Sequence, residues 1–127
     1  MKLATLILAP LALAACASVP ETSGDGIARA ALGERVYVDG PYVTPMSVLE
    51  DSRCPMNARC VSAGRTRLSV RIDLGARSET REISSEQPIQ VADGQLALVE
   101  VQPDRVAGEQ PDEPKPYRFG FTFAGGL

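Results

Sequence analysis

The chain has 127 residues, of which 44% are hydrophobic and 23% charged, with a formal net charge of −3 at neutral pH. This length suits one domain, and the acidic balance lacks the basic stripe that nucleic-acid binding requires. The sequence contains no histidine, which excludes serine–histidine and cysteine–histidine nucleophiles, histidine general bases and histidine-ligated zinc. The remaining catalytic candidates are Lys, Tyr and the carboxylate pairs Glu50-Asp51 and Asp112-Glu113, but adjacent carboxylates in loops are usually solvated. We therefore expect no enzymatic activity and no nucleic-acid partner.

The first fifteen residues have the layout of a secretory signal. Lys2 is followed by a short apolar run, and small residues precede Cys16. The thirteen residues from Leu3 to Ala15 are fewer than the roughly 20 that a membrane-spanning helix needs. The tetrapeptide Leu-Ala-Ala-Cys at 13–16 resembles a bacterial lipobox. That resemblance implies cleavage before Cys16 and attachment of lipid to its sulfur and its new amino group. An ordinary signal peptide that contains a cysteine is the alternative.

The residue after the lipobox indicates which of the two membranes would hold the lipid anchor. In enterobacterial lipoproteins an aspartate there signals retention in the inner membrane, whereas this chain has Ala17. We therefore expect several acyl chains to anchor the protein stably in the outer membrane, with its domain facing the periplasm. Residues 1–15 would be removed, 16–33 would form the lipidated cysteine and a flexible tether, and 34–127 would form a β-rich domain. Residues 27–34 could instead make a short helical turn.

From residue 35 onward the hydrophobic pattern has a period of two, which is typical of half-buried antiparallel strands. The clearest strands are 67–74 and 117–123, and the apolar face of these two predicts a core that contains Leu68, Val70, Ile72, Phe119 and Phe121. Further strands are predicted at 35–38, 42–49, 79–84, 88–91 and 96–101.

The residues between these segments refine the arrangement of the strands. Pro45 indicates an edge strand or a bulge within 42–49, and Asp93-Gly94 marks a tight hairpin between the two segments on either side of it. Many short strands predict an all-β fold, a single small antiparallel β-sandwich or barrel-like domain behind the signal peptide and tether.

Two cysteines, Cys54 and Cys60, lie between two predicted strands with five residues separating them. Disulfides persist in an oxidising compartment, and with Cys16 carrying lipid only one pairing remains. Such a short ring would stabilise the domain by about 2 kcal/mol. The alternative is a soft-metal site in which Cys54, Met56 and Cys60, with or without Met46, hold Cu(I) while the cysteines stay reduced. We favour the disulfide, and we expect no metal and no cofactor.

The segment EDSRCPMNARCVSAG at 50–64 resembles a segment of uncharacterised small bacterial lipoproteins and secreted proteins. Their pattern is D-S-R-C-P, four variable residues, C, and then x-W-x-G, with Ser62 standing here at the aromatic position. The resemblance implies no particular activity. Asp51 and Arg53 could pair with each other, Asp51 could instead accept backbone N–H bonds that fix the start of the loop, or both could be solvated.

Loops on a rigid scaffold commonly carry binding, so the 54–60 loop and the proline-rich 104–116 loop are the candidate contact surfaces. Asp51, Arg53 and Met56 are the candidate binding residues. The sequence therefore predicts a non-enzymatic envelope lipoprotein, anchored to the membrane through its N-terminal lipid, that binds an envelope protein or a small ligand or supports the cell surface.

Overall fold

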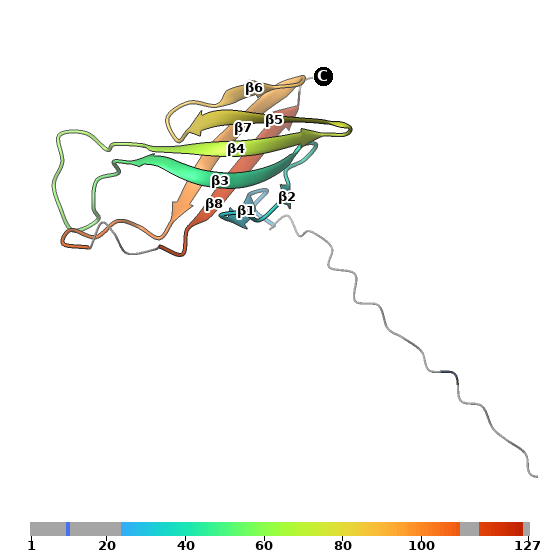
Figure 1. Cartoon of the computed structure of the whole chain (residues 1–127). Coiled ribbons are helices and arrows are strands. Elements are labelled where there is room, and N and C mark those ends of the chain that lie inside the picture. Colours follow the sequence, from blue (N-terminus) through green and yellow to red (C-terminus); the bar gives the residue numbers. More distant parts are fainter. Residues whose placement is uncertain (1–9, 11–23, 110–114, 126–127) are drawn as a thin grey trace, which may run out of the picture.

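A computed structural model of the protein describes Pro10, residues 24–109 and residues 115–125. Its strands form two four-stranded antiparallel sheets that pack face to face (Figure 1). The predicted all-β sandwich is therefore confirmed. The signal peptide, Cys16 and most of the expected tether lie outside the described residues.

Each sheet combines strands that are distant in the sequence. The first sheet has the order β1-β8-β7-β6, with bounds Ala28–Ala31, Arg118–Gly125, Gly94–Gln102 and Ile89–Val91. The second sheet has the order β2-β3-β4-β5, with bounds Val36–Tyr37, Tyr42–Asp51, Thr66–Leu74 and Arg77–Ser84. All seven strands predicted from the alternation are present, with ends that differ by a few residues.

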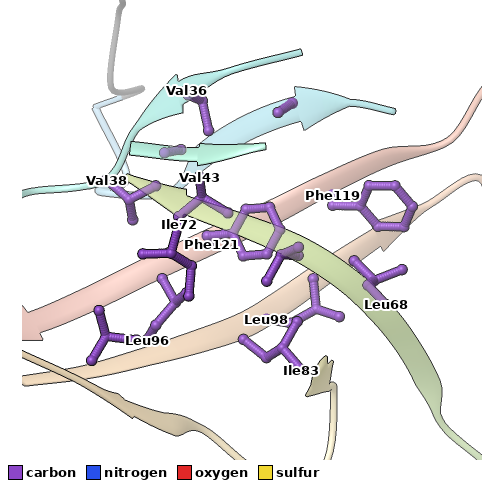
Figure 2. Close-up of a cluster of buried hydrophobic side chains, with 14 residues drawn as sticks. Val36, Val38, Val43, Leu68, Ile72, Ile83, Leu96, Leu98, Phe119 and Phe121 are labelled. Carbon is purple, nitrogen blue, oxygen red and sulfur yellow. The ribbon is translucent and has the colours of Figure 1, made fainter. Parts of the chain in front are cut away.

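The core lies between the sheets and is formed by the inward faces of β4, β7 and β8 together with residues of the shorter strands (Figure 2). The five core residues predicted from the sequence are all completely buried: Leu68, Val70, Ile72, Phe119 and Phe121. The period-two alternation therefore identifies the buried faces of β4 and β8 correctly.

The first strand corrects the interpretation of residues 27–34. Ala28 and Ala30 are buried against β8, where they pair with Phe121 and Phe119. The segment is therefore neither a helical turn nor a tether, and the folded part of the chain begins before residue 34. Alanine has a high intrinsic helix propensity, but propensity is a weak determinant, and pairing with an existing sheet overrides it here.

Pro45 lies where the sequence indicated an edge or a bulge. β3 is inside its sheet, but β2 pairs with only its first two residues, and a register shift follows between Pro45 and Ser47. The bulge is confirmed. The Pro45 carbonyl accepts a hydrogen bond from the backbone N–H of Gly33 at 2.7 Å, which satisfies one backbone group at the uncovered edge.

The tight hairpin between β6 and β7 is also confirmed, but its turn is shifted by one residue. Val91 pairs with Gly94, so the two loop residues are Ala92, with a φ of 50°, and Asp93. Gly94 already belongs to β7. A Cβ atom there would lie 2.3 Å from the Ala124 carbonyl oxygen, so this glycine permits close packing against β8.

One edge of the second sheet is formed by β5, which buries only Ile83. Its register with β4 places Glu79 opposite Ile72 and Arg81 opposite Val70, so both charged residues share the inward-facing side of the strand with Ile83. Arg81 donates from Nη1 to the Gln90 carbonyl oxygen of β6 at 2.6 Å. A charged side chain therefore bridges the two sheets at this open side of the sandwich.

Candidate functional site

Two loops meet at one end of the sandwich, where β3 leads into β4 and where β7 ends (Figure 1). We call residues 52–65 and 103–109 the loop pair. The first loop continues the β3–β4 ladder, because Ser52 N–H donates to the Arg65 carbonyl at 2.8 Å and Cys54 N–H donates to the Ala63 carbonyl at 2.9 Å. The two arms of this loop therefore run side by side beyond the ends of β3 and β4.

This close approach requires glycine at position 64. Gly64 has a φ of +69°, and a Cβ atom there would lie 1.8 Å from the Ser52 carbonyl oxygen. No side chain fits at that distance, and a positive φ is itself unfavourable for other residues. The glycine of the D-S-R-C-P segment thus has a direct structural role.

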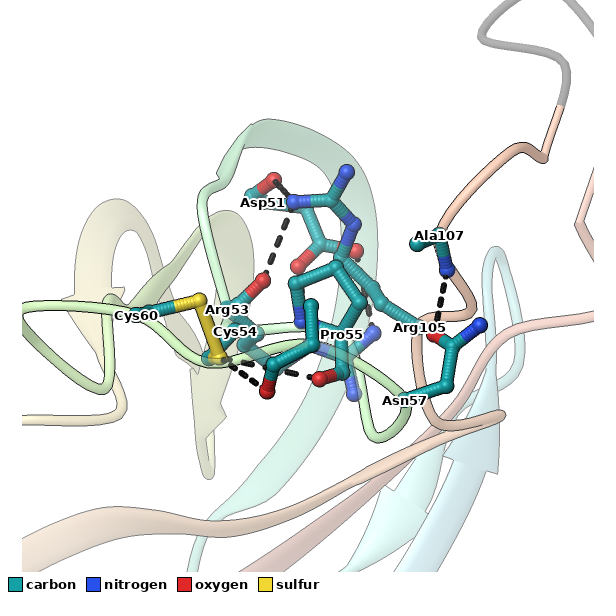
Figure 3. The surroundings of a disulfide bond; sticks show 9 residues. Asp51, Arg53, Cys54, Pro55, Asn57, Cys60, Arg105 and Ala107 are labelled. Carbon is teal, nitrogen blue, oxygen red and sulfur yellow. Dashed lines mark hydrogen bonds and ion pairs between the residues drawn. A yellow bond between two sulfur atoms is a disulfide. The ribbon is translucent and has the colours of Figure 1, made fainter.

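The predicted disulfide between Cys54 and Cys60 is present, with Cα atoms 5.9 Å apart (Figure 3). It closes the tip of the first loop above the paired arms. Because the bond uses both thiols, neither cysteine is available as a thiolate ligand for Cu(I) while it is intact. Met46 lies on β3 and Met56 in the loop.

Asp51 and Arg53 form a bidentate ion pair, the first of the three arrangements considered from the sequence. Arg53 donates from Nε to Oδ1 at 2.8 Å and from Nη2 to Oδ2 at 3.0 Å, and the two side chains are only 17% and 10% exposed. The same guanidinium donates to the carbonyl oxygens of Val101 and Pro103, both at 3.0 Å. Arg53 therefore ties the first loop to the end of β7.

Arg105 makes the reciprocal connection. Its Nη1 donates to the carbonyl oxygens of Asp51 and Arg53 at 3.2 and 3.0 Å, and its Nε donates to Glu109 at 3.1 Å. Lys115 also donates to Glu109, at 2.6 Å. Each loop thus sends one arginine into the backbone of the other segment, so both are ordered together.

The ring itself also contacts the second loop. Ala107 N–H donates to Oδ1 of Asn57 at 2.7 Å (Figure 3). Met56 N–H donates to the Arg105 carbonyl at 2.9 Å. These bonds attach the disulfide-closed tip directly to residues 105–107. The two loops that the sequence offered separately as contact candidates are therefore one surface within the described residues.

Three apolar side chains of the loop pair remain exposed. Val61 is fully exposed, Met56 is 71% exposed and Val106 is 44% exposed. These side chains make the loop pair the candidate contact surface, since loops on a rigid scaffold commonly carry binding. Of the candidate binding residues, Met56 is presented to solvent, whereas Asp51 and Arg53 hold the loops together.

The electrostatics of the site keep the ion pair charged. Burial favours the neutral form of Asp51, but the hydrogen bonds from Arg53 and from the Tyr117 hydroxyl, the latter at 2.9 Å, outweigh it, so the pKa of Asp51 lies below its ordinary value. Burial, and then the hydrogen bond to Asp51, raise the pKa of Tyr117 to about 12. At neutral pH the site therefore holds an ionised Asp51 and a protonated Tyr117.

Sequence reasoning missed the roles of Arg105 and Tyr117 here. Arg105 lies 52 residues from Arg53, and no local pattern marks it. The aromatic alternation predicts a strand that includes Tyr117, but the partner of its hydroxyl depends on how β3 and β8 are arranged. The D-S-R-C-P segment itself was the only signal that this region holds specific contacts.

Comparison with protein-family models, with curated proteins and with solved structures gave no match. No helix of the described residues is long and apolar enough to cross a membrane.

Replacing both cysteines, in Cys54→Ser/Cys60→Ser, should lower the free energy of unfolding by about 1–2 kcal/mol. The ring is short, so its constraint on the unfolded chain contributes at most about 2 kcal/mol, and the backbone bonds of the arms remain. Equilibrium denaturation measures the cost, and thiol counting on the native protein tests the bond itself. Two titratable thiols in protein taken from an oxidising periplasm would contradict the disulfide and favour the metal alternative.

Removing the Tyr117 hydroxyl, in Tyr117→Phe, should alter the ionisation of the tyrosine side chains at alkaline pH. Because the pKa of Tyr117 is raised to about 12, its contribution to stability is complete below the ordinary tyrosine pKa and is lost as the pH rises toward the folded value. For Asp51, whose pKa is lowered, the contribution is lost as the pH falls through the depressed value. The difference in phenolate absorbance between wild type and Tyr117→Phe should show one titration step, at a pH of about 12. A difference step at the ordinary tyrosine pKa would show that the hydroxyl is not buried against Asp51.

Proposed function

We propose that the protein is a membrane-anchored bacterial envelope lipoprotein whose β-sandwich is a non-enzymatic binding module. The lipobox-like segment before Cys16 supports the anchor, and Ala17 after it supports an outer-membrane location. The disulfide supports an oxidising compartment such as the periplasm. The absence of histidine from the sequence supports a role other than catalysis.

We further propose that the loop pair contacts the partner, an envelope protein or a small ligand. One observation carries this: the two loops are held together by the disulfide, by Arg53 and Arg105 and by the ring contacts, yet they expose Met56, Val61 and Val106. Ordering a loop before binding removes an entropic cost that binding would otherwise carry.

Site-specific photocrosslinking in intact cells tests the surface. A photoreactive residue at Val61 or Met56 should give a discrete crosslinked product, because these side chains project from ordered backbone. The matched control is Ala76, an exposed position in the β4–β5 turn at the other end of the sandwich (Figure 1). Equal products at all three positions, or none at the loop pair, would refute the loop pair as the contact surface.

The anchor has its own test. Cys16→Ser should prevent lipid attachment, so the variant should lose acyl mass from the mature N-terminus and leave the detergent phase on partitioning. Several acyl chains give stable anchoring, since each buried methylene contributes about 0.8 kcal/mol. Identical partitioning of variant and wild type, without acyl mass on the native N-terminus, would refute the lipoprotein assignment and leave the loop-pair proposal standing.

A further inference from the structure

The outward face of the second sheet carries a hollow of about 430 Å³ that is separate from the loop pair. Two arginines reach it from different parts of the chain, Arg35 from the segment before β2 and Arg71 from β4. The full lining consists of Gly33, Arg35, Thr44, Met46, Arg71, Asp73 and Gly75. Side chains at Gly33 and Gly75 would meet nothing within 4 Å, so the rim is open to solvent there.

A single carboxylate orients both guanidinium groups. Arg35 donates from Nε to Oδ2 of Asp73 at 3.3 Å, and Arg71 donates from Nε to Oδ1 at 3.2 Å. The Ser78 hydroxyl also donates to Asp73, which is only 12% exposed at its side chain. The carboxylate is therefore fixed in place and holds one arginine at each of its oxygens.

Further contacts limit the freedom of the two arginines. The Cζ atom of Arg35 lies 3.8 Å from the centroid of the Tyr42 ring, and Nη2 of Arg71 donates to the Ser78 hydroxyl oxygen at 3.3 Å. Within the described part of the chain, both Nη groups of Arg35 and Nη1 of Arg71 have no hydrogen-bond partner. These donors remain available on side chains that are more than half exposed, at 55% and 54%.

The charge balance distinguishes this hollow from the rest of the same face. Nearer the loop pair, Arg65 and Arg67 are surrounded by three carboxylates, those of Glu50, Glu82 and Glu86, which leaves one negative charge in excess. At the hollow, two guanidiniums face one carboxylate, which leaves one positive charge in excess. The hollow therefore carries a local positive charge on a chain whose net charge is −3.

We propose that Arg35 and Arg71 together bind a phosphate group, either free phosphate or the phosphate monoester of a lipid headgroup. The fork of a guanidinium matches pairs of phosphate oxygens, and a dianion with several acceptor oxygens can receive donors from both arginines at once. Asp73 and Tyr42 hold the arginines beforehand, which reduces the ordering cost of binding. The inference concerns a face distant from the loop pair and does not depend on the proposed function.

The full-length chain in neutral detergent, titrated with inorganic phosphate at constant ionic strength, provides the test. The side-chain N–H resonances of Arg35 and Arg71 should shift and saturate with a Kd on the order of 1 mM. Arg71→Gln should weaken binding about tenfold, the loss expected for one charge-assisted contact. Arg67→Gln is the matched control, on the same strand and face, and should leave the Kd unchanged.

Arg35→Gln provides an independent variant, because its exposed side chain precedes β2 and its loss does not remove a core contact. Short-chain phosphatidic acid distinguishes the sources: tighter binding than inorganic phosphate favours a lipid headgroup, and equal binding favours the free anion. Shifts that never saturate, equal losses in Arg67→Gln and Arg71→Gln, or acetate binding as tightly as phosphate would each overturn the proposal.

Discussion

Phe121→Ala should reduce the free energy of unfolding by about 3–5 kcal/mol, the usual range for removing a buried phenylalanine. The side chain is completely buried between the sheets. At this residue β8 pairs with both β1 and β7. Small domains are stable by only about 5–15 kcal/mol, so the variant should lose a large part of its stability. Equilibrium denaturation followed by far-ultraviolet circular dichroism measures the change.

Phe123→Ala is the matched control for this prediction. Phe123 lies two residues further along the same strand and on the same face, but it is only partly buried at the edge of the core. It should cost less than Phe121→Ala, because a side chain that is already in contact with water loses less on removal. Equal costs for the two variants, or a Phe121→Ala midpoint close to that of wild type, would show that the core is not organised around β8 as described.

Gly64→Ala should destabilise the protein by about 2–4 kcal/mol, because it combines two kinds of strain. The φ of +69° alone costs of order 1 kcal/mol for a residue with a side chain. In addition, the new Cβ atom would overlap the Ser52 carbonyl oxygen at 1.8 Å, so the arms of the first loop would have to separate. The loss should be accompanied by faster hydrogen exchange at Ser52 and Cys54, whose N–H groups bond across the arms.

Gly75→Ala separates the two contributions. Gly75 has a φ of +59° in the β4–β5 turn, and a Cβ atom there would meet nothing within 4 Å. Its substitution should therefore show only the cost of the backbone conformation, about 1 kcal/mol. The difference between the two variants then measures the close approach at Gly64. If the two substitutions cost the same, the loop arms are not held as closely as the structure has them.

The parts of the fold that could be predicted from the sequence are those that depend on local pattern. Alternation in β4 and β8 identified the buried faces, Pro45 marked a bulge, and the spacing of Cys54 and Cys60 indicated a disulfide. The strand β1 could not be found in this way, because it has only four residues and its contrast between faces rests on Arg29 alone. Its burial depends on β8, which lies almost ninety residues further along the chain.

The site was predictable to a smaller degree. Both loops were predicted from the sequence as contact surfaces, and an Asp51–Arg53 pair was one of the predicted arrangements. Nothing in the sequence indicates that the two loops meet. That meeting depends on the end of β3 and the end of β7 lying at the same end of the sandwich, which is settled only when the two sheets pack. Arg105 and Tyr117 acquire their partners at that stage, so no local pattern could have marked them.

The charged edge at β5 has a consequence for the behaviour of many copies together. An exposed strand edge can template pairing with a neighbouring chain, and inward-pointing charges are a common defence against such aggregation. Glu79 and Arg81 are placed in this way, and Arg81 already engages the carbonyl of Gln90 across the gap between the sheets. A second molecule that added its strand here would have to bury both charges. The two charges therefore disfavour strand addition at this edge, although the strand that forms it is eight residues long.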